Sequence, residues 1–446
     1  MATFDDKMSR LENADIFIQG PRITAVGRPV NKKADTIIDA ANMVALPGLI
    51  NTHHHFYQTL TRAVREVQNA KLFDWLKFLY EIWRGLTPEA VYWSALGAMG
   101  ELLLTGCTTT TDHLYLFPQS QPSILIDEEI RAAREIGIRF HPTRGSMSLG
   151  RSKGGLPPDD VVQKEEAILE DSERLIKTYH DPNPFSMCRI ALAPCSPFSV
   201  TPELMKQTAR LARDHRVLLH THLAETSDED DFCQTKLGMR PLEYMQSLDW
   251  LGNDVWYAHC VYLNEDEIKL MAETQTGVAH CPSSNMRLGS GSAPIPRMME
   301  RGVPVGLAVD GSASNDSSDM LAEARQCMLL HRLTKGVGAM SAEQSLRLAT
   351  RGGAAVFRRT DIGSIEKGKA ADMALFDLDR LDLAGALDDP VAALVFCGIS
   401  HKAHTVIVNG EVVVQDGRLA RVEERTIREQ MNKHSLRMRS NSSKRF

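Results

Sequence analysis

Eight short apolar segments, spaced regularly between residues 43 and 310, constrain the fold of this chain more than any other feature. Each is rich in β-branched or small residues, ends abruptly in polar residues, and is followed by a longer stretch of helical character, which is typical of a β/α unit. Eight such units close most readily into a (β/α)8 TIM barrel of roughly 250 residues, with its active site at the C-terminal ends of the strands. The predicted strands are MVALPGLINTHHH, CTTTTDH, IRFHPTRGS, CRIALAPCS, RVLLHTHLAE, VWYAHC, TGVAHCPSSN and PVGLAVDGS.

The segments that flank the barrel predict a smaller domain built from both ends of the chain. Two short extended runs, ADIFIQG and TIIDA, lie near the N-terminus, and Asn409-Gly410 between apolar alternations is a strong hairpin signal near the C-terminus. We therefore expect residues 1–47 and 361–446 to form a small β-sandwich domain, and residues 48–360 to form the barrel. The final segment, RMRSNSSKRF, is basic and polar and predicts a frayed tail.

Composition excludes several classes of partner. The 51 Lys and Arg residues against 57 Asp and Glu residues give a formal net charge of -6, so no bulk positive field attracts nucleic acid. No apolar run approaches the roughly 18 residues of a membrane span, and the polar N-terminus does not resemble a signal peptide. Eight scattered cysteines without a C-x-x-C pair are typical of reduced thiols. We expect a cytoplasmic homo-oligomer that acts on a small molecule and binds neither nucleic acid nor membrane.

The sharpest local signal is the run of three histidines at the end of the first predicted strand. Side chains two apart on a strand point the same way, so His53 and His55 share one face while His54 points elsewhere. Two neutral imidazoles that converge at a strand end make half of a divalent metal site. The alternative is a chance cluster that serves as polar surface.

The fifth predicted strand ends in a second signal, His222-Leu223-Ala224-Glu225. A third imidazole there can complete a ligand set, and a carboxylate three residues further on can reach over the metal as a general base without coordinating it. The alternative for Glu225 is a carboxylate favoured by a helix N-terminus. His220 lies on the same strand face but deeper, which favours packing or orientation of a metal ligand.

The sixth and eighth predicted strands end in His259 and Asp310. A carboxylate at the end of an apolar strand inside a barrel needs a partner, because a buried charge is otherwise very costly, and a metal is the obvious partner. Taken singly, His259 is equally well explained as a hydrogen-bonded structural histidine. The joint pattern of ligands from the first, fifth and eighth strands, with an acid and a base, favours a catalytic metal site.

These residues resemble the amidohydrolase superfamily over nearly the whole chain. The motifs PGLINTHHH, HLAE, YAHC, CPSSN and AVDGSASND occur in the order and spacing of that superfamily, and the pattern looks like its mononuclear deaminase branch. The segment RIALAPCS has no lysine at the end of the fourth strand, where binuclear members carry a carboxylated lysine. The resemblance implies one divalent metal per chain, with Zn²⁺ the expected ion and Fe²⁺ compatible. Its implied ligands are His53, His55, His222 and Asp310.

The same resemblance implies how the site works. A metal lowers the pKa of a water molecule toward ~7, and Asp310 orients the resulting hydroxide by a hydrogen bond. Glu225, the general base of the branch, carries a proton to a ring nitrogen of an amino-substituted heterocycle. His259 stabilises the oxygen that develops on the attacked carbon. Ammonia then leaves.

The segment HHHFYQTLTRAV, which continues into FDWLKFLYEIW, resembles the 8-oxoguanine deaminases and implies conversion of this purine to urate and ammonia. Gln58 would then supply the donor and acceptor that an oxopurine edge requires, and Arg144 and Cys195 would line the same pocket. The alternative for Gln58 is a polar group of a loop, for Arg144 a structural salt bridge, and for Cys195 a small core residue. The aromatic group from Trp75 to Trp83 suits a flat ring, but packing against the barrel or a neighbouring subunit is favoured.

The roles of two histidines are unassigned, and three alternative functions of the chain remain. His113 and His280 have no position in the ligand set, which favours structural roles. The same metal set also serves deaminases of guanine, isocytosine or an adenosine derivative, and triazine hydrolases that expel an amine or chloride. Outside catalysis, the chain would be an inactive metal-binding scaffold. Retention of Glu225 and His259 argues against a scaffold, which needs neither.

Overall fold

A computed structural model describes residues 1–28, 33–397 and 401–442, and it contains an eight-stranded parallel sheet. The backbone N–H of Thr52 donates to the carbonyl of Leu307 at 3.2 Å, so the last strand lies beside the first and the sheet closes into a ring. The predicted TIM barrel is confirmed. Its strands are β4 (Leu49–Asn51), β5 (Cys107–Leu114), β6 (Arg139–Ser146), β7 (Ala191–Pro194), β8 (Leu218–Leu223), β9 (Val255–His259), β10 (Gly277–His280) and β11 (Val305–Leu307).

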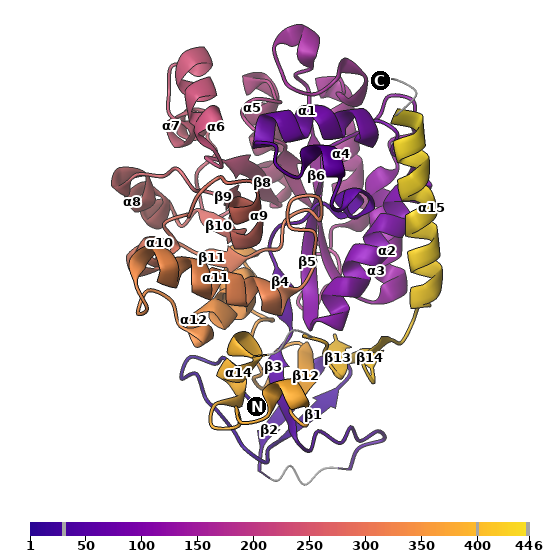
Figure 1. Cartoon of the computed structure of the whole chain (residues 1–446), viewed down its shortest axis with the longest axis vertical. Helices are drawn as coiled ribbons and strands as arrows, with labels where there is room; N and C mark the ends of the chain where they lie inside the picture. The colour runs from indigo at the N-terminus through magenta and orange to yellow at the C-terminus, as the bar shows by residue number, and fades with distance from the viewer. Residues whose placement is uncertain (29–32, 398–400, 443–446) are drawn as a thin grey trace.

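Helices surround this barrel, and local signals mark their ends (Figure 1). Thr87 and Thr201 each cap a helix N-terminus with a side-chain oxygen, and in both a proline follows at the first helical position. Gly137 ends α3 with φ of 86°. The α-helices are α1 (Leu72–Trp83), α2 (Pro88–Leu104), α3 (Leu125–Ile136), α4 (Glu165–Tyr179), α5 (Pro202–His215), α6 (Ser227–Phe232), α7 (Pro241–Ser247), α8 (Glu265–Thr274), α9 (Pro282–Arg287), α10 (Ile295–Arg301), α11 (Met320–Lys335), α12 (Ala342–Arg347), α13 (Gly353–Val356), α14 (Pro390–Phe396) and α15 (Glu424–Ser442).

Short helical turns occupy several connections. The one that matters for the site is η1, a 3-10 helix that follows the first barrel strand directly. These turns are η1 (Phe56–Thr61), η2 (Arg65–Val67), η3 (Arg151–Lys153), η4 (Asp159–Val161), η5 (Cys233–Leu237), η6 (Leu348–Gly352) and η7 (Leu381–Leu383).

A smaller β-structure from both ends of the chain covers the end of the barrel where the strands begin, opposite α1 (Figure 1). Its five-stranded antiparallel sheet packs against a two-stranded hairpin, and Ile23, Met373 and Ile407 belong to the apolar core that they share. The predicted Asn409-Gly410 turn joins two strands, with both residues at positive φ. The strands are β1 (Asp15–Gln19), β2 (Arg22–Gly27), β3 (Met43–Pro47), β12 (Met373–Asp377), β13 (Thr405–Val408), β14 (Glu411–Gln415) and β15 (Arg418–Leu419).

Two N-terminal segments differ from the sequence-based expectation. The predicted strand TIIDA is irregular, and Ile37 is 84% exposed, so its apolar residues are not part of a core. The run MVALPGLINTHHH divides into two strands, because β3 pairs antiparallel with β12 whereas β4 joins the barrel. The chain passes from the small sheet into the barrel at Gly48, where a Cβ atom would lie 2.0 Å from the Thr108 side chain.

The expected frayed C-terminal tail is wrong for the part that the structure describes. The helix α15 runs to Ser442 and lies along α2 of the barrel (Figure 1), and residues 443–446 lie outside the described residues. Ile427 and Met438 of α15 are buried, and the Ser435 hydroxyl donates to the carbonyl of Leu60 at 2.6 Å. This helix therefore packs on the barrel and not within the small sheet.

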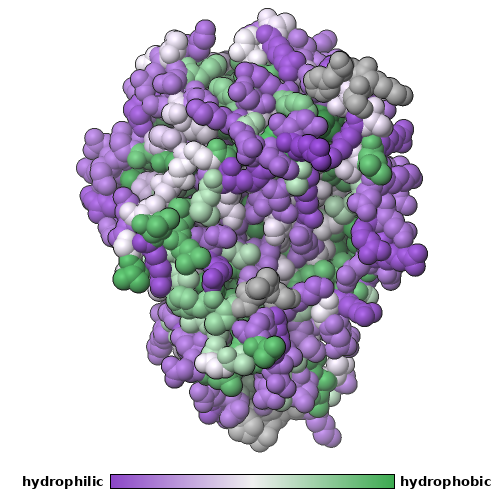
Figure 2. Space-filling model, viewed as in Figure 1, coloured by the Kyte–Doolittle hydropathy of each residue, from purple (hydrophilic) through white to green (hydrophobic). Residues whose placement is uncertain are grey.

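The described helices include none that is long and apolar enough to cross a membrane. Figure 2 shows hydrophilic residues over most of one face of the molecule, with apolar residues in scattered groups.

A buried ion pair joins the barrel to the small sheet, and we expect it to contribute strongly to stability. Arg139 of β6 binds Asp372 through Nε and Nη2, at 3.1 and 3.0 Å. Asp372→Ala would leave the buried guanidinium without its counterion, and we expect the free energy of unfolding to fall by about 3–5 kcal/mol. Urea unfolding followed by tryptophan fluorescence measures this loss.

The matched control is Glu429→Ala, which removes an exposed i,i+4 partner of Arg425 at 2.8 Å. We expect that change to cost about 0.5 kcal/mol or less, because solvent screens the pair. Equal effects of the two substitutions would contradict the structural importance of the buried pair.

Candidate active site

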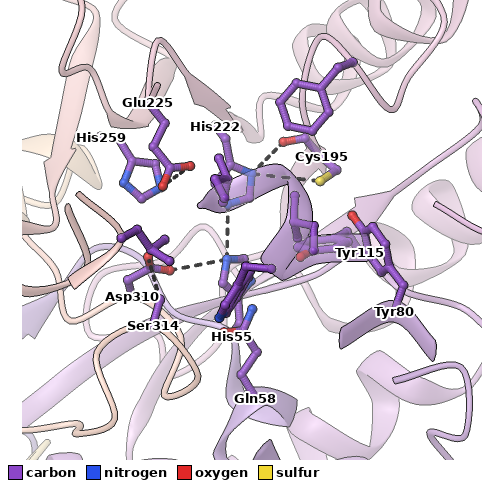
Figure 3. A pocket seen from close by; sticks show the side chains of 15 residues that line it. His55, Gln58, Tyr80, Tyr115, Cys195, His222, Glu225, His259, Asp310 and Ser314 are labelled. Carbon is purple, nitrogen blue, oxygen red and sulfur yellow. Dashed lines mark hydrogen bonds and ion pairs between the residues drawn. The ribbon is translucent and has the colours of Figure 1, made fainter. Parts of the chain in front are cut away.

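Polar side chains at the C-terminal ends of the barrel strands converge on one cavity (Figure 3), which residues of α1 also line. The cavity combines imidazoles and carboxylates on one side with aromatic and apolar side chains on the other. It is lined by His55, Gln58, Leu72, Trp75, Leu76, Tyr80, Tyr115, Cys195, Phe198, His222, Glu225, His259, Leu288, Asp310 and Ser314.

A chain of hydrogen bonds fixes the ring of His53 at the base of this cavity. His220 Nδ1 lies 2.9 Å from the carbonyl of Trp256, which only accepts, so this nitrogen carries the proton. His220 Nε2 is then the acceptor for His53 Nδ1 at 2.8 Å. His53 Nε2 therefore presents a lone pair, and it is buried without a hydrogen-bond partner.

His55 and His222 are oriented by backbone carbonyls in the same way. His55 Nδ1 donates to the carbonyl of His113 at 2.7 Å, and His222 Nδ1 donates to the carbonyl of Cys195 at 2.7 Å. Each ring therefore keeps a lone pair on Nε2, and these two Nε2 atoms lie only 3.1 Å apart. Neighbouring lone pairs at this distance repel unless a proton or a cation lies between them.

Asp310 completes this group of donors. Its Oδ1 lies 3.3 Å from His53 Nε2 and 3.5 Å from His55 Nε2. Donors bound to Zn²⁺ at about 2.0–2.1 Å in a tetrahedron are separated by about 3.3–3.4 Å, so the observed spacing fits a divalent cation. We therefore name His53, His55, His222 and Asp310 the four-donor cluster.

Electrostatics also favour a cation at the four-donor cluster. Burial lowers the pKa of His53, His55 and His222, so the three imidazoles are neutral near pH 7. Burial by itself would raise the pKa of Asp310, but its close contact with His53, at 3.3 Å, and the other surrounding imidazoles lower it well below its usual value. Three neutral imidazoles and one carboxylate form a typical ligand set for Zn²⁺.

Strained backbone accompanies the site residues where the strands end. Ala224, His259 and Asp310 have positive φ values of 51°, 73° and 62°. Side-chain-bearing residues rarely adopt this conformation, and it persists where the surrounding structure fixes it, commonly at functional sites. Here the sharp turns aim the side chains of neighbouring strand ends into one cavity.

Glu225 and His259 lie side by side next to the four-donor cluster (Figure 3), with Glu225 Oε2 3.5 Å from His259 Nε2. Burial and the charges of Asp310 and Glu229 raise the pKa of Glu225 well above its usual value. Glu225 precedes α6 but points into the cavity, which argues against a role at the helix N-terminus. The carboxylate of Glu229 fills that role, since it accepts the backbone N–H groups of Ala224 and Glu225 at 2.9 and 3.1 Å.

Gln58 and Cys195, two of the three predicted substrate contacts, line the cavity. Gln58 Oε1 is buried without a hydrogen-bond partner. It occupies space left by Gly311, where a Cβ atom would lie 2.0 Å from this oxygen. The thiol of Cys195 is neutral, because burial raises its pKa to about 12.

Arg144, the third predicted contact, does not line the cavity. Its Nε donates to Asp171 at 2.7 Å and its Nη2 to Gln163 at 2.9 Å, while the guanidinium lies 4.0 Å from the centre of the Phe117 ring. The prediction is corrected to its alternative, a structural salt bridge, because the side chain points toward α4 and not toward the barrel centre.

The aromatic group is divided between two roles. Trp75 and Tyr80 of α1 line the cavity, while Trp83 of the same helix donates its indole N–H to Thr61 at 3.0 Å. Tyr115 and Phe198 also line the cavity, and no sequence pattern singled them out, because they lie beyond the strand-end signals.

The two unassigned histidines lie outside the four-donor cluster. His113 stacks on His222 with ring centres 4.7 Å apart, and its Nε2 donates to the carbonyl of Ala193 at 2.8 Å. His280 pairs with His331 of α11, with Nε2 atoms 3.1 Å apart. Both arrangements agree with structural roles.

The His220 hydrogen bond generates a prediction about metal binding. We expect His220→Ala to weaken divalent metal binding about 10–100-fold, because His53 loses the partner that fixes its tautomer and orientation. Competition with a chromogenic chelator measures the affinity. His141→Gln is the control, because it removes a buried imidazole that stacks on Phe357 away from the cluster, and a comparable loss there would contradict the prediction.

Comparisons with known proteins agree with this geometry. Residues 44–413 match the amidohydrolase family. The chain is 52% identical over 379 residues to 8-oxoguanine deaminase of Pseudomonas aeruginosa, which covers 85% of this chain and 84% of that protein. It is 35% identical over 424 residues to hydroxydechloroatrazine ethylaminohydrolase of a Pseudomonas strain, which covers 93% and 87% of the two chains.

Solved structures show the same barrel. Atrazine chlorohydrolase from Arthrobacter aurescens, complexed with zinc, superposes with a TM-score of 0.92 at 36% identity and covers 97% of this chain and 98% of its own. An adenosine deaminase from Xanthomonas campestris with bound zinc gives a TM-score of 0.86 at 25% identity, with 96% and 94% covered. The chain therefore belongs to the amidohydrolase family, as a hydrolase that acts on C–N bonds.

Proposed function

We propose that this protein hydrolyses 8-oxoguanine to urate and ammonia. The observation that carries the proposal is the placement of Glu225 and His259 beside the four-donor cluster in a buried cavity. One water is consumed, the bond between the ring carbon and its amino group breaks, and a ring carbonyl replaces the amine. The 52% identity to the Pseudomonas aeruginosa 8-oxoguanine deaminase supports this substrate.

We propose that His53, His55, His222 and Asp310 hold one divalent metal, with Zn²⁺ favoured by the donor types and Fe²⁺ compatible with them. The metal would act as a Lewis acid that makes hydroxide available from water near neutral pH. The lone pairs on three Nε2 atoms, fixed by the partners of the Nδ1 atoms, support this assignment.

Glu225 moves the protons of the reaction. It takes a proton from the attacking water and delivers it to the ring nitrogen next to the attacked carbon, which makes that carbon more electrophilic. Burial and the Asp310 charge raise the pKa of Glu225, and a raised pKa lets a carboxyl group hold a proton near neutral pH. The second proton of the water then passes from the hydroxyl of the tetrahedral centre to the amino group, which leaves as ammonia while the ring carbonyl forms.

His259 and the remaining cavity walls act on the substrate itself. His259 donates an N–H to the oxygen that develops on the attacked carbon. The Gln58 amide has an unpaired oxygen that can accept from a purine N–H, and its NH₂ can donate to an oxo group. Trp75 and Tyr80 offer aromatic surface to a flat ring.

A triazine aminohydrolase is the second candidate. The specific observation in its favour is the 35% identity to hydroxydechloroatrazine ethylaminohydrolase over 93% of this chain. An aminotriazine presents the same ring nitrogen beside an exchangeable amine, so Glu225 and His259 would act in the same way. The difference lies in the ring that the cavity wall accepts.

A substrate panel tests the proposal. We expect the metal-loaded protein to release ammonia fastest from 8-oxoguanine, compared with guanine, isocytosine, adenosine and a hydroxylated aminotriazine, with urate followed by ultraviolet absorbance. We expect Glu225→Gln to lower kcat about 10²–10⁴-fold at unchanged metal content, because it removes the proton carrier. The exposed Glu273→Gln is the control.

Two outcomes would contradict different parts of the proposal. Rapid guanine turnover without action on 8-oxoguanine would overturn the substrate. Undiminished turnover in Glu225→Gln would overturn the assignment of the base.

Gln58 generates a separate prediction about specificity. We expect Gln58→Leu to lower kcat/KM for 8-oxoguanine about 10–100-fold, because the oxopurine edge then faces an apolar side chain and loses its hydrogen bonds. The same change at Gln68, an exposed glutamine that follows η2, is the matched control and should leave kcat/KM unchanged. Full activity of the Gln58 variant would refute a contact with the substrate.

A further inference from the structure

We infer that Asn285 is a positioning residue, which holds His259 in the tautomer with its proton on Nε2 so that the ring presents an N–H donor to the cavity. The sequence motif CPSSN, which ends in this asparagine, has no role in the chemistry described so far. The kinetic consequence rests on the proposed function, but the tautomer itself does not.

The contact that carries this inference is short and buried. Asn285 Nδ2 lies 3.0 Å from His259 Nδ1, and both residues are almost completely buried. Asn285 belongs to α9, where its backbone N–H donates to the carbonyl of Cys281 at 3.1 Å and its carbonyl accepts from Ser290 at 2.8 Å. The amide is therefore attached to a backbone that is fixed on both sides.

The partners of the two ring nitrogens determine where the proton lies. Asn285 Nδ2, which only donates, lies 3.0 Å from Nδ1, so the hydrogen of the ring belongs on Nε2, which faces Glu225 Oε2 at 3.5 Å. A neutral imidazole has a single N–H, which leaves Nδ1 as an acceptor. Of the two ends of the Asn285 amide, only the NH₂ can donate to it.

The opposite orientation of the amide is unfavourable. Asn285 Oδ1 would then accept from an Nδ1–H, and Nε2 would direct a lone pair at the Glu225 carboxylate. A lone pair and a carboxylate oxygen that face each other at 3.5 Å repel. The arrangement with Nδ2 toward Nδ1 avoids it.

This tautomer matters because the two forms of the ring do different chemistry. An Nε2–H can donate to an oxygen that gains negative charge on the attacked carbon, whereas an Nε2 lone pair repels that oxygen. Asn285 never reaches the substrate in this arrangement, since it does not line the cavity. It acts through His259.

The first measurement reads the tautomer in the wild-type protein. In metal-loaded protein with ¹⁵N-labelled histidine, the ring nitrogen shifts report which nitrogen carries the proton, and His259→Asn identifies the resonances of His259. We expect the Nε2–H tautomer in the wild-type protein without substrate. An Nδ1–H tautomer there would overturn the inference whatever the substrate proves to be.

Asn285→Asp then reverses the direction of the hydrogen bond to His259, because the new side chain has nearly the same size as asparagine but no NH₂ group. The carboxylate can only accept, so we expect the His259 proton to move to Nδ1. We expect kcat to fall about 10²-fold, the usual cost of losing one oxyanion donor, with KM within about threefold and metal content unchanged. Any substrate of the panel that is turned over serves for this assay, so failure of 8-oxoguanine as substrate is a separate result.

Ser284→Ala is the matched control, because Ser284 is the preceding buried residue of α9 and its hydroxyl has no hydrogen-bond partner. We expect it to change neither the His259 shifts nor kcat. If Asn285→Asp does not fold, Asn285→Ala replaces it, and the proton should then distribute between both ring nitrogens. A variant at position 285 that keeps the wild-type tautomer and kcat would overturn the inference.

Discussion

The hydrogen bonds of three Nδ1 atoms are the interactions on which the candidate site depends. Two backbone carbonyls, those of His113 and Cys195, and one imidazole, that of His220, each take a proton from a histidine of the four-donor cluster. The opposite nitrogens are thereby left as lone pairs at 3.1–3.5 Å from one another or from Asp310. Since all of these partners lie on or just after barrel strands, closure of the barrel also orients the donors.

The candidate site and the small antiparallel sheet lie at opposite ends of the barrel. The small sheet covers the end where the strands begin, and the pair between Arg139 and Asp372 fixes it there. The site occupies the other end, where residues at strand ends adopt positive φ and carboxylates are buried together. The strained backbone and the buried carboxylates, which destabilise the fold, are thus concentrated at one end of the barrel. The small sheet and its buried ion pair stabilise the other end.

The sequence predicts the barrel and the positions of the metal-site histidines, because a single pattern determines each of them. Apolar strands that stop abruptly mark their own C-terminal ends, and the two-residue period places His53 and His55 on one face but not His54. Arg144 shows the limit of this rule. Parallel strands of a barrel are apolar on both faces, so the sequence does not reveal that its side chain turns toward Asp171 in α4.

Two other features were missed for different reasons. Glu229 belongs to an acidic run that looks like an ordinary helix start, and only the structure shows both of its oxygens bound to the turn that carries Glu225. The helix α15 has a narrow apolar stripe, Ile427, Met431 and Met438, at helical spacing among many charged residues. Composition favoured a solvated tail, although the spacing alone would have predicted a helix that packs on one face.

The division between strands and connections explains why the reaction class is easier to infer than the substrate. The four-donor cluster, Glu225 and His259 all lie on or just after barrel strands, whose positions are constrained by the closed sheet. Much of the remaining cavity wall comes instead from η1, α1 and the segment after α9, which contribute Gln58, Trp75, Tyr80 and Leu288. These segments can change without altering the barrel, so a similar barrel can serve a purine or a triazine. Under the proposed function, the choice of substrate would therefore depend on whether the unpaired Gln58 oxygen meets a donor on the ring that enters.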